Sequence, residues 1–252
     1  MSDPAAWWGE GTYERLAERL APIHDELVRR LAPASDERWL DVAAGPGAVA
    51  IRAAQAGARV SASDLSPAMI ERARTAARAA GVELELATAD ARSLPDEDAS
   101  FDVVSSAFGV IFAPEPERVA SELARVCRLG ARLGLTTWAS NEELDAVWEP
   151  FAEGRPAPTE VWGEERSLER LLGDHFDLEV ERGSWLVTGR NGAEVWELFA
   201  SSAPPVRTLL GSLPEERRPA LRNAFVDLHE RYRDERGVRF PMQYLLVLGR
   251  RR

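Results

Sequence analysis

The chain has 252 residues, of which 45% are hydrophobic and 29% charged, as in a globular protein with one large domain. Its formal net charge of −11 argues against a nucleic-acid or anionic-membrane partner, because phosphate contacts need clustered basic side chains. No lysine occurs and Cys127 is the single cysteine, which excludes Schiff-base chemistry, an intrachain disulfide and a multi-cysteine metal site.

The chain begins Met1-Ser2-Asp3-Pro4, without the basic start and apolar run of a secretion signal. No apolar run is long enough to span a bilayer. With a single cysteine, these features lead us to expect a cytoplasmic protein with no membrane partner.

The first half of the chain alternates between helical and strand patterns. Helical spacing of apolar residues predicts helices over 10–31, 47–56, 67–80 and 116–128. Strand patterns fall at 38–43, 58–63, 82–88, 101–106 and 131–138. This alternation predicts an α/β fold with a parallel sheet and helices on both faces.

The second half departs from that alternation. Residues 141–153 and 165–172 read as helices, and 176–181 as an alternating strand. Two further helices are predicted at 192–202 and 214–236, separated by Pro204-Pro205 and Pro214. An apolar strand at 244–248 ends the pattern.

Two strands end in an acid, and a glycine turn follows the first. Asp41 precedes the turn Gly45-Pro46-Gly47, and Asp64 ends the next strand. Glycines let a ligand approach the backbone, and a strand-end acid can accept both hydroxyls of a ribose. These residues predict a nucleoside-binding crevice at the carboxyl ends of parallel strands.

Two kinds of nucleoside are compatible with this turn. Residues 45–50 also satisfy the loose dinucleotide fingerprint G-x-G-x-x-G/A. A pyrophosphate at the helix N-terminus would be repelled by Asp41, whereas the sulfonium and ammonium of S-adenosylmethionine would be attracted. Asp41 therefore favours S-adenosylmethionine.

Residues 41–47 resemble motif I, Asp-x-x-x-Gly-x-Gly, of the class I S-adenosylmethionine-dependent methyltransferases. Ala43 to Gly47 are similar to the ubiquinone/menaquinone-biosynthesis type. The resemblance implies a Rossmann-like seven-stranded, mostly parallel sheet with helices on both faces, an antiparallel last strand and a helical cap insert at about 190–239. It divides the chain into an N-terminal helical lid, 1–35, and a methyltransferase domain, 36–252.

The same resemblance implies the donor-binding residues. Asp90-Ala91, after the third strand, would read the adenine, and the segment with Ser106 and Phe108 would lie beneath the reacting methyl. The expected donor-binding residues are Asp41, Ala43, Gly45, Gly47, Asp64, Leu65, Met69, Asp90, Ala91, Ser106 and Phe108. No metal is expected, because no two histidines have metal-site spacing.

The acceptor side is less marked in the sequence. Of the three histidines, His24 and His175 are expected to be structural, and His229 is the best candidate for a general base. Aromatic residues near the expected lid and cap are candidates for the substrate pocket: Trp8, Tyr13, Phe112, Trp196 and Phe199.

These features lead us to expect methyl transfer from S-adenosylmethionine to an oxygen, carbon or nitrogen of a small molecule, aromatic or a secondary metabolite. A non-catalytic S-adenosylmethionine-binding protein and an NAD-dependent dehydrogenase are the alternatives. Titration with S-adenosylmethionine and with NAD distinguishes a methyltransferase from a dehydrogenase. A measurement of turnover excludes the non-catalytic binding protein.

Overall fold

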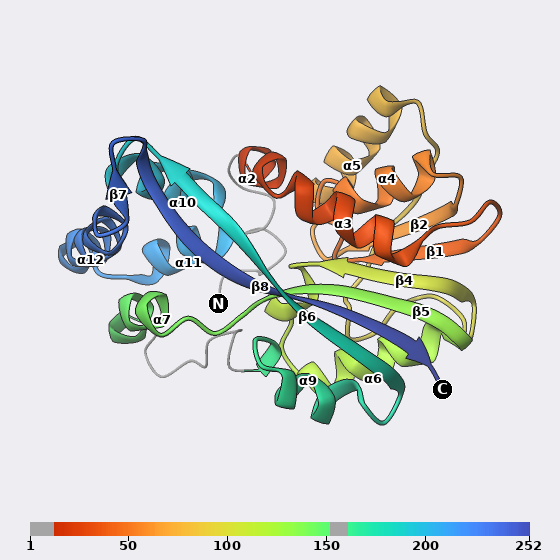
Figure 1. Ribbon diagram of the computed structural model, residues 1–252. Helices are drawn as coiled ribbons and strands as arrows, with labels where there is room; N and C mark the ends of the chain where they lie inside the picture. The colour runs from red at the N-terminus through yellow and green to blue at the C-terminus, as the bar shows by residue number, and fades with distance from the viewer. Residues whose placement is uncertain (1–12, 152–160) are drawn as a thin grey trace.

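The computed structural model describes residues 13–151 and 161–252 (Figure 1). Its sheet follows the strand order β3-β2-β1-β4-β5-β8-β6, and a short β7 pairs with β8. The strands are β1 (Arg38–Val42), β2 (Arg59–Asp64), β3 (Glu85–Thr88), β4 (Phe101–Ala107), β5 (Cys127–Trp138), β6 (Phe176–Gly189), β7 (Arg233–Asp234) and β8 (Gly237–Arg251).

Helices cover both faces of this sheet, with α3, α4 and α5 on one face and α6 and α9 on the other (Figure 1). The helices in the sheet half are α2 (Tyr13–Arg19), α3 (Ala21–Leu31), α4 (Ala48–Gln55), α5 (Pro67–Ala80), the 3-10 turn η1 (Val110–Phe112), α6 (Pro116–Val126) and α9 (Glu165–Leu172). Those of the second half are α7 (Glu142–Trp148), η2 (Glu149–Phe151), α10 (Gly192–Ser202), α11 (Pro204–Ser212), η3 (Glu215–Arg217) and α12 (Arg218–Glu230).

The strands from β1 to β5 pair in parallel, whereas β8 runs antiparallel to both β5 and β6. β1 lies between β2 and β4, so the strand order reverses at β1. Ligands of open α/β sheets bind at the carboxyl ends of the strands beside such a reversal. The predicted mostly parallel sheet with an antiparallel last strand is confirmed.

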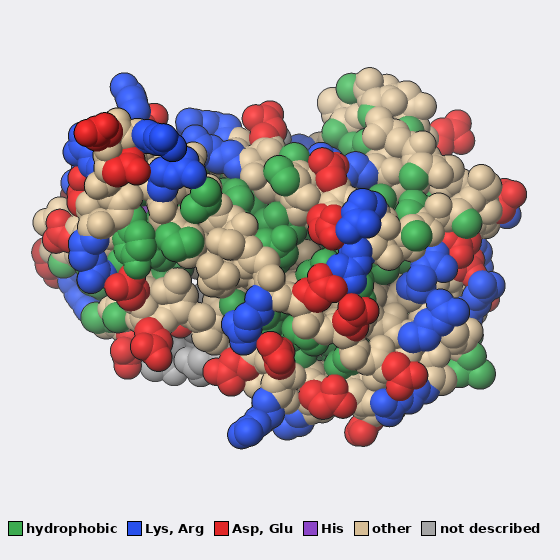
Figure 2. Space-filling model, in the orientation of Figure 1, with side chains coloured by type: hydrophobic (Ala, Val, Ile, Leu, Met, Phe, Trp, Pro, Cys, Tyr) green, Lys and Arg blue, Asp and Glu red, His purple; other side chains and the backbone are tan. Residues whose placement is uncertain are grey.

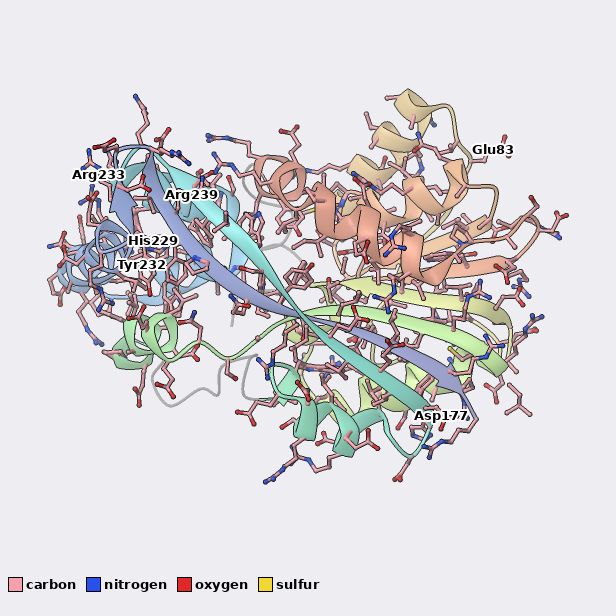
Figure 3. All side chains as sticks on the ribbon, viewed as in Figure 1. Glu83, Asp177, His229, Tyr232, Arg233 and Arg239 are labelled. Atoms are coloured by element: carbon pink, nitrogen blue, oxygen red, sulfur yellow. The ribbon has the colours of Figure 1, made fainter. Side chains whose placement is uncertain are left out.

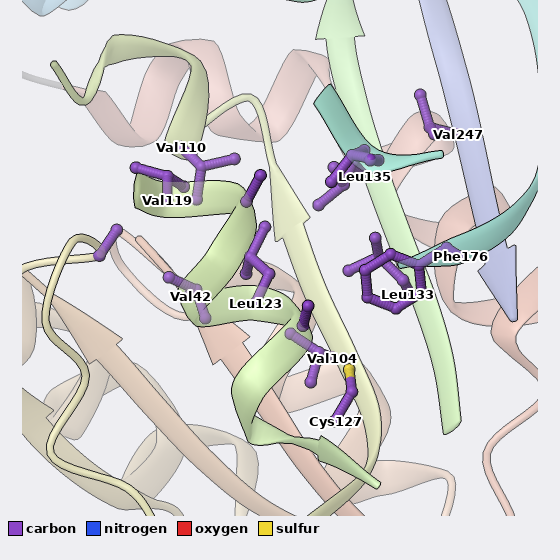
Figure 4. Packing of buried hydrophobic residues seen from close by; sticks show 14 of the residues in the cluster. Val42, Val104, Val110, Val119, Leu123, Cys127, Leu133, Leu135, Phe176 and Val247 are labelled. Atoms are coloured by element: carbon purple, nitrogen blue, oxygen red, sulfur yellow. The ribbon is translucent and has the colours of Figure 1, made fainter. Parts of the chain in front are cut away.

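Alternate side chains of β1 enter two different cores. Trp39 packs with α3 and α4, whereas Leu40 and Val42 pack with α6. Figure 4 shows the second core, where Val42, Leu123 and Phe176 gather between α6 and the sheet. Because side chains alternate across a strand, Asp41 points to the same side as Trp39 and lies beneath α4.

The long pair β6 and β8 extends beyond the sheet and joins it to the helices α10, α11 and α12 (Figure 1). We call these helices and β7 the cap. The strands predicted at 176–181 and 244–248 are shorter than β6 and β8. One half of this strand pair is covered by α9, and the other half is covered by the cap. Trp185 and Val187 of the extension belong to the core of the cap.

The helix predicted over 214–236 is shorter in the structure, because α12 ends at Glu230 and Arg233–Asp234 form β7. Prolines account for two other differences from the predicted helices. The single helix expected over 10–31 divides into α2 and α3, because Pro22 lies in the first turn of α3 and cannot continue the preceding helix. Pro204 begins α11, a helix that the sequence pattern did not predict, since proline is tolerated at the first helical position.

Acidic side chains and arginines are interspersed over the face shown in Figure 2. Many of them form ion pairs, such as Arg30 with Glu181 at 2.6 Å. This face therefore offers no unbroken basic surface for a phosphate backbone. Among the described helices, none has the length and apolar character needed to cross a bilayer.

Candidate functional site

A cavity lies at the carboxyl ends of β1, β2 and β4, where the strand order reverses. Its walls come from the turn after β1, the ends of β2 and β4, the loop after β3, and the helices α2 and α3. The expected donor-binding residues that line it are Asp41, Ala43, Gly45, Asp64, Leu65, Met69, Asp90, Ala91 and Phe108. The sequence motifs thus meet in one place.

The turn between β1 and α4 depends on left-handed backbone conformations. Ala43, Gly45 and Gly47 have φ of 53°, 55° and 85°. Gly47 precedes the first residue of α4, and a Cβ there would lie 3.3 Å from the Cβ of Ala73 on α5. Gly47 therefore shapes the turn and the packing of α4 against α5, and it does not itself line the cavity.

The Asp64 carboxylate is held by backbone N–H groups. Its Oδ2 accepts from the N–H of Gly45 at 2.8 Å, and its Oδ1 accepts from the N–H of Ser66 at 2.9 Å. Burial raises the pKa of Asp64, and these two hydrogen bonds oppose that rise. Two bonds leave lone pairs free on a carboxylate, so the group can still accept from ribose hydroxyls.

The side chain of Ser66 does not cap α5, although Ser66 directly precedes the helix. Its hydroxyl makes no capping bond and has no hydrogen-bond partner among the described residues. The Asp64 carboxylate accepts the backbone N–H of Ser66 instead. The strand-end acid therefore orders the helix start as well as facing the cavity.

Asp41 is buried, with 1% of its surface exposed. Ser105 donates its hydroxyl to Oδ1 of Asp41 at 2.7 Å, and Trp39 Nε1 donates to Ser105 at 2.8 Å. Burial raises the pKa of the Asp41 carboxyl to about 7, although hydrogen bonds from Ser105 and the backbone of Ala50 oppose the rise. A cation in the cavity would favour the ionised form.

Asp90 forms an ion pair with Arg92, a residue that sequence reasoning did not assign. Nη2 and Nε of Arg92 donate to Oδ2 of Asp90 at 2.7 and 3.1 Å, and the guanidinium also contacts Glu115. Hydrogen bonding to Arg92 lowers the pKa of Asp90. The carboxylate is thus ionised and fixed in orientation beside the cavity.

The segment after β4 approaches Ala43 closely at Gly109. Phe108 has φ of 53°, a rare conformation for a residue with a side chain. A Cβ on Gly109 would lie 2.5 Å from the carbonyl oxygen of Ala43, so only glycine fits there. On its other side the Phe108 ring stacks on Trp138, with centroids 4.0 Å apart.

Tyr13, Ala17 and His24 of the N-terminal helices complete the described wall. Tyr13 Cε1 lies 3.6 Å from where a Cβ of Gly45 would stand, and burial raises the Tyr13 pKa to about 12. His24 also lines the cavity, although the sequence favoured a purely structural role. His24 lies seventeen residues before Asp41 in the chain, and no spacing rule connects the two.

Several expected residues lie elsewhere. Ser106 is buried behind the wall, where its Oγ accepts the N–H of Val110 at 3.2 Å. Trp196, Phe199 and His229 surround Phe225 in the core of the cap and are not part of the cavity wall. Figure 3 shows His229 beside Tyr232 within the cap. Of the remaining candidates, Phe112 lines the cavity, and Trp8 lies outside the described residues.

His229 has the surroundings of a core residue, which revises its assignment as a general base. Its ring stacks on Phe225 at a centroid distance of 4.1 Å, and Nδ1 lies 2.8 Å from the carbonyl oxygen of Phe225. Burial lowers the pKa of His229. The imidazole is 1% exposed and does not line the cavity, which favours a structural role over that of a general base.

The charged groups of the cavity fit the sulfonium and ammonium of S-adenosylmethionine better than the pyrophosphate of a dinucleotide. Asp41 and Asp64 both present carboxylates beside the glycine turn, and the cationic Arg92 is already paired. A pyrophosphate at this turn would meet two negative charges, whereas a sulfonium and an ammonium would be attracted. Across residues 13–151 and 161–252, no group of three potential metal ligands comes together.

Known proteins are similar to this chain in sequence. A family model described as a methyltransferase domain matches residues 40–130. An uncharacterized protein of Mycobacterium tuberculosis is 43% identical over 188 residues, which cover 71% of this chain and 69% of that protein. A demethylmenaquinone methyltransferase of Clavibacter sepedonicus is 39% identical over 127 residues, 48% of this chain and 51% of the relative.

Solved structures are similar to this chain in fold. The YcgJ protein of Bacillus subtilis superposes with a TM-score of 0.66 at 17% identity, covering 91% of this chain and 97% of that one. The matched methyltransferase segment contains Asp41, Asp64 and Asp90 together with the glycine turn. With its parallel sheet, its three acids at one edge and these relatives, the chain belongs to the class I S-adenosylmethionine-dependent methyltransferases.

Proposed function

We propose that this methyltransferase acts on a small, uncharged acceptor whose reacting atom is a phenolic oxygen or an electron-rich ring carbon. The observation that carries the proposal is the apolar character of the part of the cavity wall that lies beyond the donor-binding motifs. Phe108, Val110 and Phe112 line it with apolar side chains, followed by Ala113 and Pro114. Such a wall favours a flat apolar molecule and excludes water from the reacting centre.

We assign the donor to the acidic half of the cavity. S-adenosylmethionine supplies, when bound, a methyl group already activated by its sulfonium. Asp64 would accept the ribose hydroxyls, and Asp90, oriented by Arg92, would accept from the adenine amine. Asp41 would balance the positive charge at the methionine end. The side chains of Leu65 and Met69 supply apolar contact for the base.

The proposal of an intrinsically acidic acceptor follows from the histidine and the tyrosine of the wall, since Asp41 is assigned above to the positive charge of the donor. His24 is the histidine among the described residues of the wall, and burial lowers its pKa to about 4, so it is a weak base. Burial raises the pKa of Tyr13 to about 12, which leaves its phenol protonated. An acceptor whose hydroxyl is acidic by itself, or whose ring carbon is already electron-rich, needs only orientation and proximity.

Anionic acceptors such as diphosphates fit the wall poorly. The cationic side chain that lines it, Arg92, is paired with Asp90 and Glu115. The named activity of the demethylmenaquinone methyltransferase relative supports a ring acceptor. Breaking the Arg92 pairs to bind a phosphate would leave Asp90 without its partner.

The N-terminal helices and the cap are assigned supporting roles. Tyr13 of α2 stands over the glycine turn, as a lid over the donor would. The cap contacts the wall directly, because α10 packs against α2. A second connection runs through Trp138, which stacks on Phe108 and also packs against Trp185, with ring centroids 5.8 Å apart. We propose that the segment 1–35 closes the donor site and that the insert at about 190–239 holds the acceptor wall in place.

The proposal is tested by measuring S-adenosylhomocysteine release with a panel of acceptors: phenols, dihydroxynaphthalenes, reduced quinones, primary amines and an isoprenoid diphosphate. A ¹³C-labelled methyl group then identifies the methylated atom by NMR. Turnover is expected with the phenolic and quinol members. Turnover confined to the amine or the diphosphate would contradict the proposed acceptor class and leave the family assignment intact.

A further inference from the structure

Phe108 is a residue of the cavity wall whose backbone is strained. Its φ of 53° lies in the left-handed region, which is rare for a residue with a side chain. A strained backbone of this kind persists only where the surrounding structure holds it. Part of this support is local, because the N–H of Phe108 donates to the carbonyl oxygen of Thr136 at 3.0 Å. Further support comes from the residues that pack around the ring.

Two aromatic side chains from neighbouring strands contact the ring of Phe108. Trp138, at the end of β5, stacks on it with centroids 4.0 Å apart and an interplanar angle of 18°. Tyr244, on β8, meets it edge-on, with centroids 6.2 Å apart and an angle of 75°. Trp138 and Tyr244 are directly opposite each other on β5 and β8, so their side chains lie on the same face of the sheet. Both residues are outside the described cavity wall, so they act on a bound acceptor through Phe108.

The place of the Tyr244 ring depends on a glycine in the adjacent strand. β8 lies between β5 and β6 (Figure 1), and Tyr244 is directly opposite Gly183 of β6. A Cβ on Gly183 would overlap the ring of Tyr244, with Cζ, Cε1 and the hydroxyl oxygen as the nearest atoms. The backbone of Gly183 is not in the left-handed region, so a larger residue is excluded by the ring and not by the backbone. Gly183 therefore provides the space in which the Tyr244 ring lies.

We propose that Tyr244 is a positioning residue for methyl transfer, which holds Phe108 in the orientation that the acceptor needs. Gly183 makes this contact possible, because it leaves room for the Tyr244 ring across β6. Tyr244 contacts neither substrate in this scheme, and its effect on the reaction passes through Phe108. Such an effect is measurable, because a misplacement of about 1 Å can slow an enzymatic reaction about a hundredfold. The inference rests on the acceptor wall proposed above and adds to it a residue from outside the cavity.

The kinetic test uses Gly183→Ala, which displaces the Tyr244 ring, and Tyr244→Leu, which removes it. In both variants kcat with a methylated acceptor is expected to fall about tenfold, whereas affinity for S-adenosylhomocysteine is expected to stay within about twofold. Tyr244→Phe keeps the ring and is expected to retain most of the turnover. Ser184→Ala is the matched control, because Ser184 is exposed and points to the opposite face of β6, and it is expected to change neither quantity.

Double variants separate this contact from general destabilisation, because Tyr244 also packs against the core of the cap and the core beneath α3 and α4. In Tyr244→Leu the ring atoms that a Cβ on Gly183 would meet are gone. Adding Gly183→Ala should then lower kcat no further. Gly183→Ala should likewise have no effect on kcat in a Phe108→Leu background, a comparison that suffices if Tyr244→Leu does not fold. Losses that multiply in these double variants would show that the residues act separately, and the inference would be wrong.

Crystal structures of the unmodified protein and of Gly183→Ala test the inference without an acceptor. In the variant the Tyr244 ring is expected to leave its place across β6, and the Phe108 ring is expected to lose its stacking on Trp138. A Phe108 ring that stays in place beside a displaced Tyr244 would overturn the inference, as would an unchanged kcat in Gly183→Ala. If no acceptor of the panel were methylated, the proposed acceptor class would fail, and the two structures would still decide whether Tyr244 positions Phe108.

Discussion

The backbone N–H of Gly45 donates a 2.8 Å hydrogen bond to Oδ2 of Asp64 and so ties the turn after β1 to the end of β2. The other carboxylate oxygen accepts the N–H of Ser66, where α5 begins. One acid therefore orders both segments that border the proposed ribose site. Its removal should affect stability and donor binding together, which distinguishes it from a simple surface ligand.

The first prediction concerns Asp64→Ala. We expect the affinity for S-adenosylmethionine to fall by about 1–3 kcal/mol through lost ribose hydrogen bonds. The free energy of unfolding should also fall, by about 1–2 kcal/mol, because two buried N–H groups lose a charged acceptor. Calorimetry and urea denaturation measure the two effects. Glu83→Ala, an exposed acid far from the cavity (Figure 3), is the matched control and should change neither. Full donor affinity in Asp64→Ala would remove Asp64 from the site.

The second prediction follows from the Asp41 pKa of about 7. An aspartate of the unfolded chain has a pKa of about 3.9. Between these values the folded protein holds a proton that the unfolded chain has released, so the Asp41 contribution to stability falls as the pH rises through this window. Relative to the unmodified protein, Asp41→Asn should therefore gain about 1–3 kcal/mol in free energy of unfolding between pH 5 and pH 8. Denaturation curves at both pH values give this difference.

Donor affinity should show the opposite trend with pH. A cationic ligand favours ionised Asp41, so S-adenosylmethionine should bind more tightly as the pH rises from about 6 to 8. Asp41→Asn should bind weakly with little pH dependence in this range. If the variant kept the same slope, another group would be responsible for the titration, and Asp41 would not face the cation.

The local motifs of the sequence predicted the acids at the strand ends, and the tertiary packing determined the rest. Asp41, Asp64 and Asp90 follow from strand endings, because parallel strands bring their carboxyl ends to one edge. His24 could not be assigned from the sequence, since its place in the wall depends on how α3 packs against α4. The Arg92 pair with Asp90 is local, yet an arginine two residues after an acid is too common a pattern to single out.

In the cap, by contrast, the structure places two predicted substrate-pocket residues outside the cavity wall. Trp196 and Phe199 are spaced on one helical face, as a pocket wall would be. The same spacing serves a helix packed against its neighbour, and α12 supplies that neighbour through Phe225. Periodicity identifies the buried face of a helix and gives no information on what covers it.

Gly109→Ala is predicted to disturb both sides of the cavity. Gly109 has φ of −101°, which alanine can adopt, so the obstacle is the space: the new Cβ would lie 2.5 Å from the carbonyl oxygen of Ala43. We expect a loss of about 1–3 kcal/mol in free energy of unfolding, with weaker donor binding as Ala43 shifts. Gly211→Ala, on α11 with open space around it, should instead stabilise by about 0.5–1 kcal/mol. Equal effects of the two variants would show that the Ala43 contact can relax freely.

The last prediction separates the core of the cap from the acceptor site. The ring of Phe225 lies 5.4 Å from the rings of both Trp196 and Phe199, and 4.1 Å from that of His229. Trp196→Ala and Phe199→Ala should each lower the free energy of unfolding by about 3–5 kcal/mol, as expected for large aromatic residues in a core. His229→Phe keeps an aromatic ring in the stack and should leave kcat unchanged. If His229 were a general base, the same substitution would abolish kcat. Denaturation curves and steady-state kinetics at a temperature where each variant is folded provide the measurements. A higher acceptor KM with unchanged stability would place Trp196 and Phe199 against the acceptor after all, because only a residue that contacts the ligand can weaken binding without weakening the fold.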